Sequence, residues 1–183
     1  MVAFSLLQHL WRRHSTGPLP AIGTGHFGKP GFVTRHDLHF NWSHHAAMCV
    51  CALSTRPVGV DIQARVPFRA ALFDRIAADS EHRLRDRMTA ADDLSPLWTR
   101  KEAVLKRTGR GTTTALRDID TVTDDDIVTF TNPEPDFHLS LTVAGLDSGT
   151  VLDGLRITWL RPTDTTDLWV PDPDRPALRQ WCP

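Results

Sequence analysis

The sequence predicts an α+β fold, because segments with helical periodicity alternate with short β-rich runs along the 183 residues. The clearest helix is expected from about Ser95 to Thr108, where a Ser-Pro pair opens the segment and Gly109 ends it. The clearest strands are the apolar run 46–53 and the β-branched run 58–62, which we expect to pair as a hairpin. A chain of this length forms one domain or two small halves packed together.

The other segments are assigned from periodicity and turn residues. A first helix is expected over residues 3–14, followed by a long loop rich in glycine and proline. After the strand pair we expect a helix opened by Pro67 and another capped by Ser80. Later strands are expected at 127–131, 137–143 and 155–160, the first two joined by a turn at 132–135.

The order of these elements fits two β-plus-helix halves, although the sequence contains no visible internal repeat. We expect residues 1–160 to form one domain, with the boundary between its halves near 65–95. Residues 161–183 are rich in Asp, Thr and Pro and are expected to form an extended C-terminal tail.

The composition is that of an ordinary soluble protein, with 40% apolar and 23% charged residues. The formal net charge of −1 provides no general attraction to nucleic acid or membranes. No apolar run approaches the length of about 18 residues that is typical of a membrane-spanning helix. Three cysteines are too few for a disulfide framework, so we expect a cytoplasmic protein with neither a nucleic-acid nor a membrane partner.

An acidic residue, Asp61, lies near the end of the β-branched run 58–62. A carboxylate that ends a buried strand is often exposed in a cleft at the edge of the sheet. Gly59, two residues before it, allows another backbone or a ligand to approach closely. The alternative is an Asp that only ends the strand and caps a turn.

The helix expected at 95–108 carries Trp98, Glu102 and Lys106 at positions i, i+4 and i+8, which share one face. Glu102 and Lys106 alone could be a surface ion pair that contributes a few tenths of a kcal/mol. A face that begins with a large aromatic side chain is more often turned inward or into a cleft. The pattern therefore favours a cleft that contains both a carboxylate and an amine.

Two further segments contain side chains suited to anions. Ser43 and His44 lie directly before the apolar run 46–53, where they could donate hydrogen bonds to an anion or simply cap and pack the strand. Lys29 lies between a glycine and a proline, which presents its ammonium group on a stiff turn.

These features together predict a metal-assisted reaction on a substrate that contains a pyrophosphate. Mg²⁺ prefers one or two carboxylates with phosphate oxygens and water as its other ligands, and Asp61 and Glu102 can supply the carboxylates. The remaining phosphate charge would be neutralised by Lys106, Lys29 and His44.

Four blocks in this order, GKP, FNWSHH, VGVDIQ and WTRKEAVLKRTGRG, resemble the motifs of the 4′-phosphopantetheinyl transferase superfamily. The similarity covers roughly residues 25–145 and is greatest to the stand-alone, surfactin-synthetase-activating type. It implies two similar α/β halves related by a pseudo-twofold axis, with the active site between them, and a monomer. It also implies transfer of the phosphopantetheine arm of coenzyme A to a serine of an apo acyl or peptidyl carrier protein, with release of 3′,5′-ADP.

The resemblance also implies roles for the acidic motif residues. Asp61 and Glu102 would bind Mg²⁺ together with the pyrophosphate, and Glu102 would deprotonate the carrier serine directly or through water. Many members of this branch have Glu as a further metal ligand at the position of Gln63. The neutral amide of Gln63 could ligate Mg²⁺ through its oxygen or orient a bound water.

The remaining roles implied by the resemblance concern the substrate. Lys106 would stabilise charge on the phosphates as ADP leaves, and Lys101 would lie beside the cleft. Ser43 and His44 would hold the phosphates of coenzyme A, and Lys29 would lie near the adenine nucleotide. Carrier proteins are usually acidic around the modified serine, so Arg65 and Arg69 and the arginines of 83–87 are candidates for a docking surface.

Three other interpretations fit the sequence less well. A zinc site from the histidines has no standard ligand spacing; the residues in question are His36, His39, His44 and His45. A metal-dependent nuclease or phosphohydrolase would need a one-residue gap between Glu and Lys on a strand, and a more basic chain. The third is a catalytically weakened carrier-protein-binding module, which only the neutral Gln63 suggests.

Overall fold

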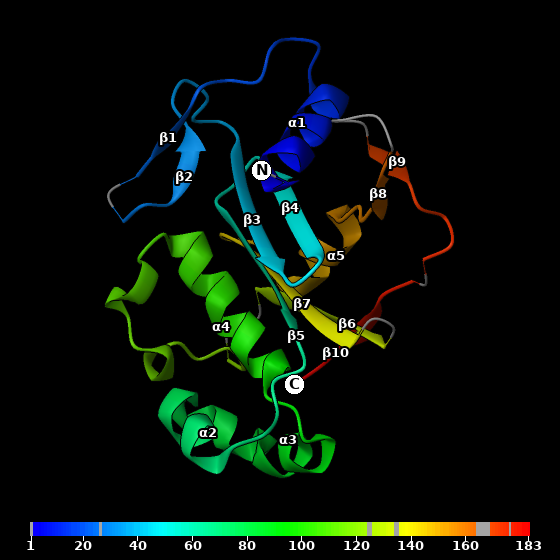
Figure 1. Cartoon of the computed structure of the whole chain (residues 1–183). Coiled ribbons are helices and arrows are strands. Elements are labelled where there is room, and N and C mark those ends of the chain that lie inside the picture. Colours follow the sequence, from blue (N-terminus) through cyan, green and yellow to red (C-terminus); the bar gives the residue numbers. More distant parts are fainter. Residues whose placement is uncertain (1, 26, 124–125, 134–135, 164–168, 176) are drawn as a thin grey trace.

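The predicted mixture of helices and strands is confirmed in the computed structural model, which describes residues 2–25, 27–123, 126–133, 136–163, 169–175 and 177–183 (Figure 1). The helices are α1 (Val2–His14), α2 (Ala70–Ile76), α3 (Arg85–Ala91), α4 (Ser95–Thr108) and α5 (Ser148–Gly154), with short 3₁₀ helices η1 (Asp79–Leu84), η2 (Gly111–Thr113) and η3 (Leu116–Asp118). The strands are β1 (Ile22–Thr24), β2 (Pro30–Phe32), β3 (His39–His45), β4 (Met48–Ser54), β5 (Val58–Ala64), β6 (Ile127–Pro133), β7 (Asp136–Val143), β8 (Leu160–Pro162), β9 (Trp169–Pro171) and β10 (Arg179–Trp181).

The largest sheet is antiparallel and has the strand order β10-β6-β7-β5. β3 and β4 form a separate hairpin that packs across β5. The amide oxygen of Asn41 on β3 accepts a hydrogen bond of 2.9 Å from the backbone N–H of Val60 on β5. This buried bond fixes β3 to β5 between Asn41 and Val60, next to Ser43 on β3 and Asp61 on β5.

Several local predictions are confirmed. α1 covers the segment expected at 3–14, α4 matches the expected helix, and Gly109 ends it with a positive φ of 69°. β6 and β7 form the expected hairpin. The helix begins one residue earlier than the Ser-Pro pair predicts, because Ser95 is its first residue and not its cap. Asp93 accepts hydrogen bonds from the N–H and the hydroxyl group of Ser95.

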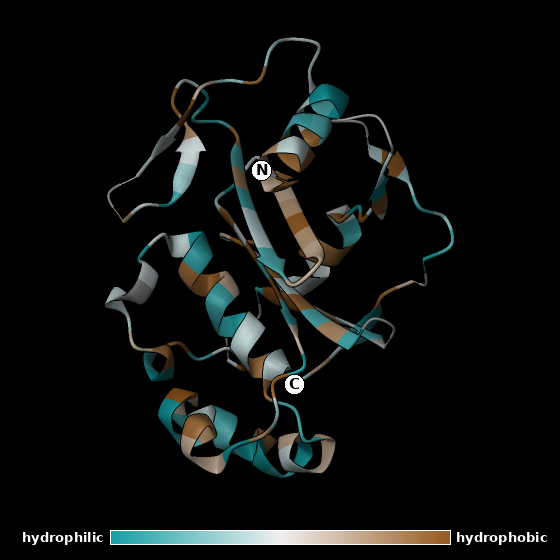
Figure 2. Ribbon diagram, viewed as in Figure 1, coloured by the Kyte–Doolittle hydropathy of each residue, from teal (hydrophilic) through white to brown (hydrophobic). Residues whose placement is uncertain are grey.

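The expected hairpin between 46–53 and 58–62 is wrong. β4 pairs with β3, and β5 pairs with β7. The β3–β4 turn consists of Ala46 and Ala47, with a positive φ of 50° at Ala46, and it lacks the Asn or Gly that usually marks such a turn. β4 is apolar from Met48 to Leu53 (Figure 2), yet every residue in it is only partly buried, so it is not the fully buried strand that was expected.

Other differences are smaller. The long loop after α1 contains the β1–β2 hairpin, and α2 begins at Ala70, three residues after Pro67. Ser80 does not cap a helix; its hydroxyl group donates to Asp120. The strand expected at 155–160 is wrong. Residues 155–159 form an irregular connection after α5, and strand β8 begins only at Leu160. The expected tail contributes β10, which extends the main sheet.

The two faces of the main sheet differ in polarity. On one face the apolar side chains of β5 and β7 form the main core cluster, including Val60, Ile62 and Leu141. The other face is covered by α4 and is buried but polar, with Thr129 and Ser140 fully buried. The hydroxyl groups of Thr99 on α4 and Ser140 on β7 are 2.8 Å apart, so the polar face is hydrogen-bonded to the helix.

Gly59 allows α4 to pack directly against β5. A Cβ atom at this position would overlap the backbone oxygen of Ala103 and the backbone nitrogen of Arg107. The close approach therefore requires a residue without a side chain. None of the helices in the described ranges is both long and apolar enough to cross a membrane.

We expect Gly59→Ala to destabilise the protein by about 3 kcal/mol or more, because neither backbone group can move without displacing α4. The measurement is urea unfolding followed by circular dichroism. Gly31→Ala is the matched control, since a Cβ atom at Gly31 would meet nothing within 4 Å. Equal stability of the two variants would contradict the close contact.

Candidate active site

Three elements bring four of the predicted site residues together. β3 contributes Ser43, β5 contributes Asp61, and α4 contributes Glu102 and Lys106. The Lys106 ammonium group donates to Asp61 Oδ1 at 2.6 Å and to the Ser43 hydroxyl group at 2.7 Å. Ser43 in turn donates to the same Asp61 oxygen at 2.7 Å. The result is a closed triangle of Ser43, Asp61 and Lys106.

Burial differs within this group. Asp61 and Ser43 are almost fully buried, with 6% of each exposed, whereas 28% of the Lys106 side chain is accessible. Lys106 therefore reaches Asp61 from the solvent side. The three side chains hold one another in place, and solvent reaches them on the side of Lys106.

Glu102 lies one helical turn before Lys106 and is partly buried. Burial raises the pKa of its carboxyl group, the nearby Asp61 carboxylate raises it further, and Lys106 acts in the opposite direction. Two carboxylates that repel each other in a partly buried site are a typical arrangement for binding a cation or a proton.

The donor set fits Mg²⁺. Asp61 Oδ1 is occupied by Ser43 and Lys106, whereas its Oδ2 accepts no hydrogen bond from the described part of the chain. Gln63 lies two residues after Asp61 on β5, so its side chain is on the same face of the strand and is partly buried. Asp61, Glu102 and the amide oxygen of Gln63 are the residues that could hold the ion.

No group of three or more His, Cys, Asp or Glu side chains within the described ranges is arranged to hold a metal. The zinc alternative therefore has no support there. His44 follows Ser43 on β3, where its side chain is exposed and alternates to the other face of the strand. Of the four histidines considered, His36 and His39 line a cavity instead.

Lys101 does not lie beside the cleft, and that prediction is wrong. Its side chain is fully buried and forms an ion pair of 2.6 Å with the equally buried Glu81. Its ammonium group also donates to the backbone oxygens of Leu116 and Ile119. Lys101 and Lys106 are five residues apart on α4, so they point in different directions. Lys101 anchors α4 to the segments around η1 and η3.

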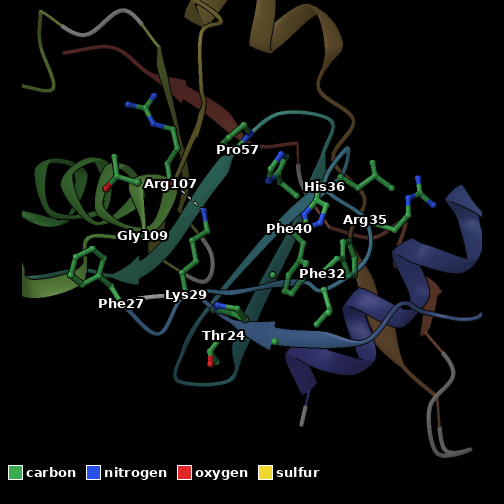
Figure 3. A pocket seen from close by; sticks show the side chains of 18 residues that line it. Thr24, Phe27, Lys29, Phe32, Arg35, His36, Phe40, Pro57, Arg107 and Gly109 are labelled. Atoms are coloured by element: carbon green, nitrogen blue, oxygen red, sulfur yellow. Dashed lines mark hydrogen bonds between the residues drawn. The ribbon is translucent and has the colours of Figure 1, made fainter.

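Lys29 is also held by the protein. Its ammonium group donates to the backbone oxygens of Val58 at 3.1 Å and Arg107 at 2.8 Å, the latter drawn as a dashed line in Figure 3. Lys29 therefore connects the β1–β2 loop to β5 and to the C-terminal end of α4. Burial lowers the pKa of Lys29 to about 8, and the nearby Arg107 contributes to the decrease.

A cavity of about 630 Å³ adjoins this contact and is lined by both polar and apolar side chains (Figure 3). Several of its cationic or basic side chains were not assigned to the site from the sequence: Arg35, His36, His39 and Arg107. Burial lowers the pKa of His39, Lys29 and His36 contribute to the decrease, and the Asp37 carboxylate opposes it. The only local signal for Arg107 was its position directly after Lys106.

The cavity and the carboxylates are connected through two elements. On β3, Phe40 lines the cavity while Ser43 belongs to the triangle. On α4, Arg107 lines the cavity while the preceding Lys106 contacts Asp61. A ligand with a polyanionic group at the triangle could therefore place its other end in the cavity.

Comparison with known proteins agrees with these motifs. Residues 57–158, which contain Asp61, Glu102 and Lys106, match the family described as the 4′-phosphopantetheinyl transferase superfamily. The chain belongs to this superfamily. The matched residues include β5 and α4, the two elements that carry the carboxylates.

Individual relatives show the same relationship at modest identity. The chain is 30% identical over 93 residues to 4′-phosphopantetheinyl transferase Sfp of Bacillus subtilis, covering 49% of this chain and 42% of Sfp. It is 36% identical over 103 residues to AcpT of Escherichia coli, covering 52% of each chain. It is 33% identical over 88 residues to gsp of Aneurinibacillus migulanus, covering 46% of this chain and 36% of gsp. The matched part thus spans about half, or less, of each of these relatives.

We expect Glu102→Gln to raise the melting temperature at pH 7 in EDTA, because the variant removes the repulsion between Glu102 and Asp61. The shift should be about 2–4 °C for each kcal/mol of repulsion removed. Added Mg²⁺ should then stabilise the wild-type protein more than the variant. An equal Mg²⁺ response in both proteins, measured by calorimetry, would contradict the metal assignment.

A second prediction concerns Lys29 and pH. The unfolded chain keeps the Lys29 proton up to about pH 10.5, whereas the folded chain loses it near pH 8. In that window the unfolded state binds more protons, so this residue makes the free energy of unfolding increase with pH. Lys29→Met should lack this increase. Parallel stability curves for the two proteins between pH 8 and 10.5, measured by urea unfolding, would show that the pKa of Lys29 is not lowered.

Proposed function

We propose that this protein transfers the 4′-phosphopantetheine arm of coenzyme A to a serine of an apo acyl or peptidyl carrier protein and releases 3′,5′-ADP. The observation that carries the proposal is the contact of Ser43, Asp61 and Lys106 beside the half-buried carboxylate of Glu102. Membership of the superfamily supports it, as do relatives named 4′-phosphopantetheinyl transferase.

In the proposed reaction the pyrophosphate of coenzyme A lies at the triangle. Ser43 donates a hydrogen bond to its oxygens, and Lys106 neutralises their charge. His44 lies on the other face of β3, so its expected contact is with another phosphate of coenzyme A. Asp61, Glu102 and Gln63 would hold Mg²⁺, which would supply positive charge to offset the charge of the pyrophosphate. Gln63 contributes an amide in place of a third carboxylate, so the site carries one negative charge fewer.

The chemical step is a phosphoryl-type transfer to a hydroxyl group. The oxygen of the carrier serine attacks the phosphorus that bears the pantetheine arm, and the bond from that phosphorus to the oxygen of 3′,5′-ADP breaks. Glu102 accepts the serine proton directly or through water. Burial and Asp61 raise the pKa of Glu102, which makes it a stronger base than an exposed glutamate. Lys106 stabilises the negative charge that develops on the departing ADP.

The cavity beside Lys29 is the proposed place for the adenine nucleotide. His36 and His39 line it and, with Lys29, provide cationic or hydrogen-bonding groups for a phosphate on the ribose. The guanidinium group of Arg107 is instead paired with Asp126 and donates to Thr142. Lys29 itself keeps its two backbone bonds in this arrangement, so its role is to hold the loop over the nucleotide and to contribute charge.

Three coarser expectations remain part of the proposal. The site lies between two similar halves of residues 1–160, with their boundary near 65–95, and residues 161–183 follow them as a C-terminal segment that adds β10 to the main sheet. The protein acts as a monomer in the cytoplasm. The carrier protein approaches α2 and the segments on either side of it, where Arg65, Arg69 and the arginines of 83–87 would face acidic residues around the serine.

The test is incubation with coenzyme A, Mg²⁺ and a panel of apo acyl and peptidyl carrier proteins, followed by mass measurement of the carrier. The wild-type protein should add one phosphopantetheine group. Glu102→Ala should reduce the rate by at least about 100-fold, because both the base and a metal ligand are lost. Asp118→Ala, which removes an exposed carboxylate on η3, is the control and should react like the wild-type protein. Transfer at the normal rate by a folded Glu102→Ala variant would refute the assignment.

A further inference from the structure

A second cavity, of about 720 Å³, lies on the other side of the main sheet from the candidate active site. Its floor includes Val58, Val60 and Ile62, which alternate along β5 with Gly59 and Asp61 on the opposite face. α4 covers the face that carries Asp61, so the two cavities are separated by the sheet. The volume is in the range of small-molecule sites, which is about 300–1,000 Å³.

The lining of this cavity is mainly apolar and incompletely covered. β4 lines it along its length, and all of its residues remain partly exposed. Val2 at the start of α1 is 53% exposed and Ile157 after α5 is 44% exposed, and both lie at the cavity. Apolar side chains left accessible around a hollow indicate a binding site for an apolar group.

One side of the cavity is polar and positively charged. α1 lines it with Val2, Leu6, His9, Leu10 and Arg13, a set that follows helical spacing. His9 Nε2 is buried and has no hydrogen-bond partner among the residues that the structure describes. A buried imidazole nitrogen without a partner is costly unless a ligand or water satisfies it.

Most of the charged lining residues that the structure describes are basic. They include Arg156, Arg161 and Arg175 besides Arg13, and the acidic Asp172 is paired with Arg175. Burial lowers the pKa of His9, and the charges of Arg13 and Arg12 lower it further. A bound anion would offset these charges and accept a hydrogen bond from His9 or Arg13.

We propose that this cavity binds a single-chain fatty acid, with the acyl chain along β4 and β5 and the carboxylate at His9 and Arg13. Apolar walls with a cationic rim are complementary to a ligand with one long apolar chain and one anionic end. The site is independent of coenzyme A transfer, because it shares no lining residue with the cavity beside Lys29 and lies behind the sheet.

The cavity also provides its own spectroscopic probe, since Trp159 and Trp169 line it. A fatty acid brominated along its chain should quench the fluorescence of the full-length protein, and unlabelled dodecanoate should reverse the quenching. Titrations are made below the critical micelle concentration. Trp159→Phe should reduce the quenched fraction, which locates the ligand.

Two variants separate the parts of the site. Arg13→Glu should weaken binding of dodecanoate about tenfold or more, because it replaces an attraction by a repulsion. Arg117→Glu, which reverses an exposed charge outside the cavity lining, is the matched control and should bind normally. Val50→Phe should abolish binding by filling the space beside β4, while circular dichroism reports that the variant is folded.

Dodecanol serves as the test of the anionic end and should bind at least about tenfold more weakly than dodecanoate. Equal binding of the alcohol and the acid would overturn the role of His9 and Arg13. Absence of quenching in the wild-type protein would overturn the site itself. A wild-type dimer that Val50→Phe converts to a monomer would also overturn it, since a second copy of the chain would then occupy the apolar cavity.

Discussion

The close contact between α4 and β5 is the constraint on which the candidate active site depends. Gly59 leaves no side chain between the strand and the backbone of Ala103 and Arg107. Because the two backbones touch, Lys106 reaches Asp61 at 2.6 Å and Glu102 is close enough for Asp61 to raise its pKa. A larger residue at position 59 would displace α4 and move Glu102 and Lys106 away from Asp61.

The polarity of the sheet follows from the same contact. A helix that packs closely on a strand through glycine, serine and threonine leaves little room for large apolar side chains, and the buried hydroxyl groups must then find partners. Ser140 is placed between Thr99 and Thr129, at 2.8 and 3.0 Å, and meets this requirement. The apolar core lies on the opposite face. The apolar face of the sheet thus forms the core that stabilises the fold, and the polar face under α4 carries the candidate active site. In that site the carboxylates of Glu102 and Asp61 repel each other.

Much of the fold was predictable where the signal is local. The Ser-Pro pair and Gly109 define α4, and the two predicted strands on either side of 132–135 correspond to the hairpin of β6 and β7, although residues 134–135 of the predicted turn lie outside the described part of the chain. The β3–β4 hairpin could not be found, because its turn of two alanines has none of the usual turn residues. β5 and β7 are far apart in the sequence, and α4, which lies between them in the sequence, packs on both. A short window of sequence therefore cannot predict that these two strands pair.

The two lysines of the α4 motif show what sequence spacing can and cannot decide about a site. Both lie in the block by which the family was recognised, and both were assigned to the substrate. Lys101 is instead fully buried against Glu81, a residue twenty positions earlier that carried no sign of its partner in the sequence. Lys106 forms an ion pair with Asp61, and its side chain remains partly accessible to solvent. A helix that must hold a charged group against a carboxylate needs an anchor on another of its faces, and the Lys101–Glu81 pair, with its backbone acceptors, supplies that anchor. The motif therefore combines the reacting groups with the contacts that hold them in place, which explains why it contains more charged residues than the chemistry alone requires.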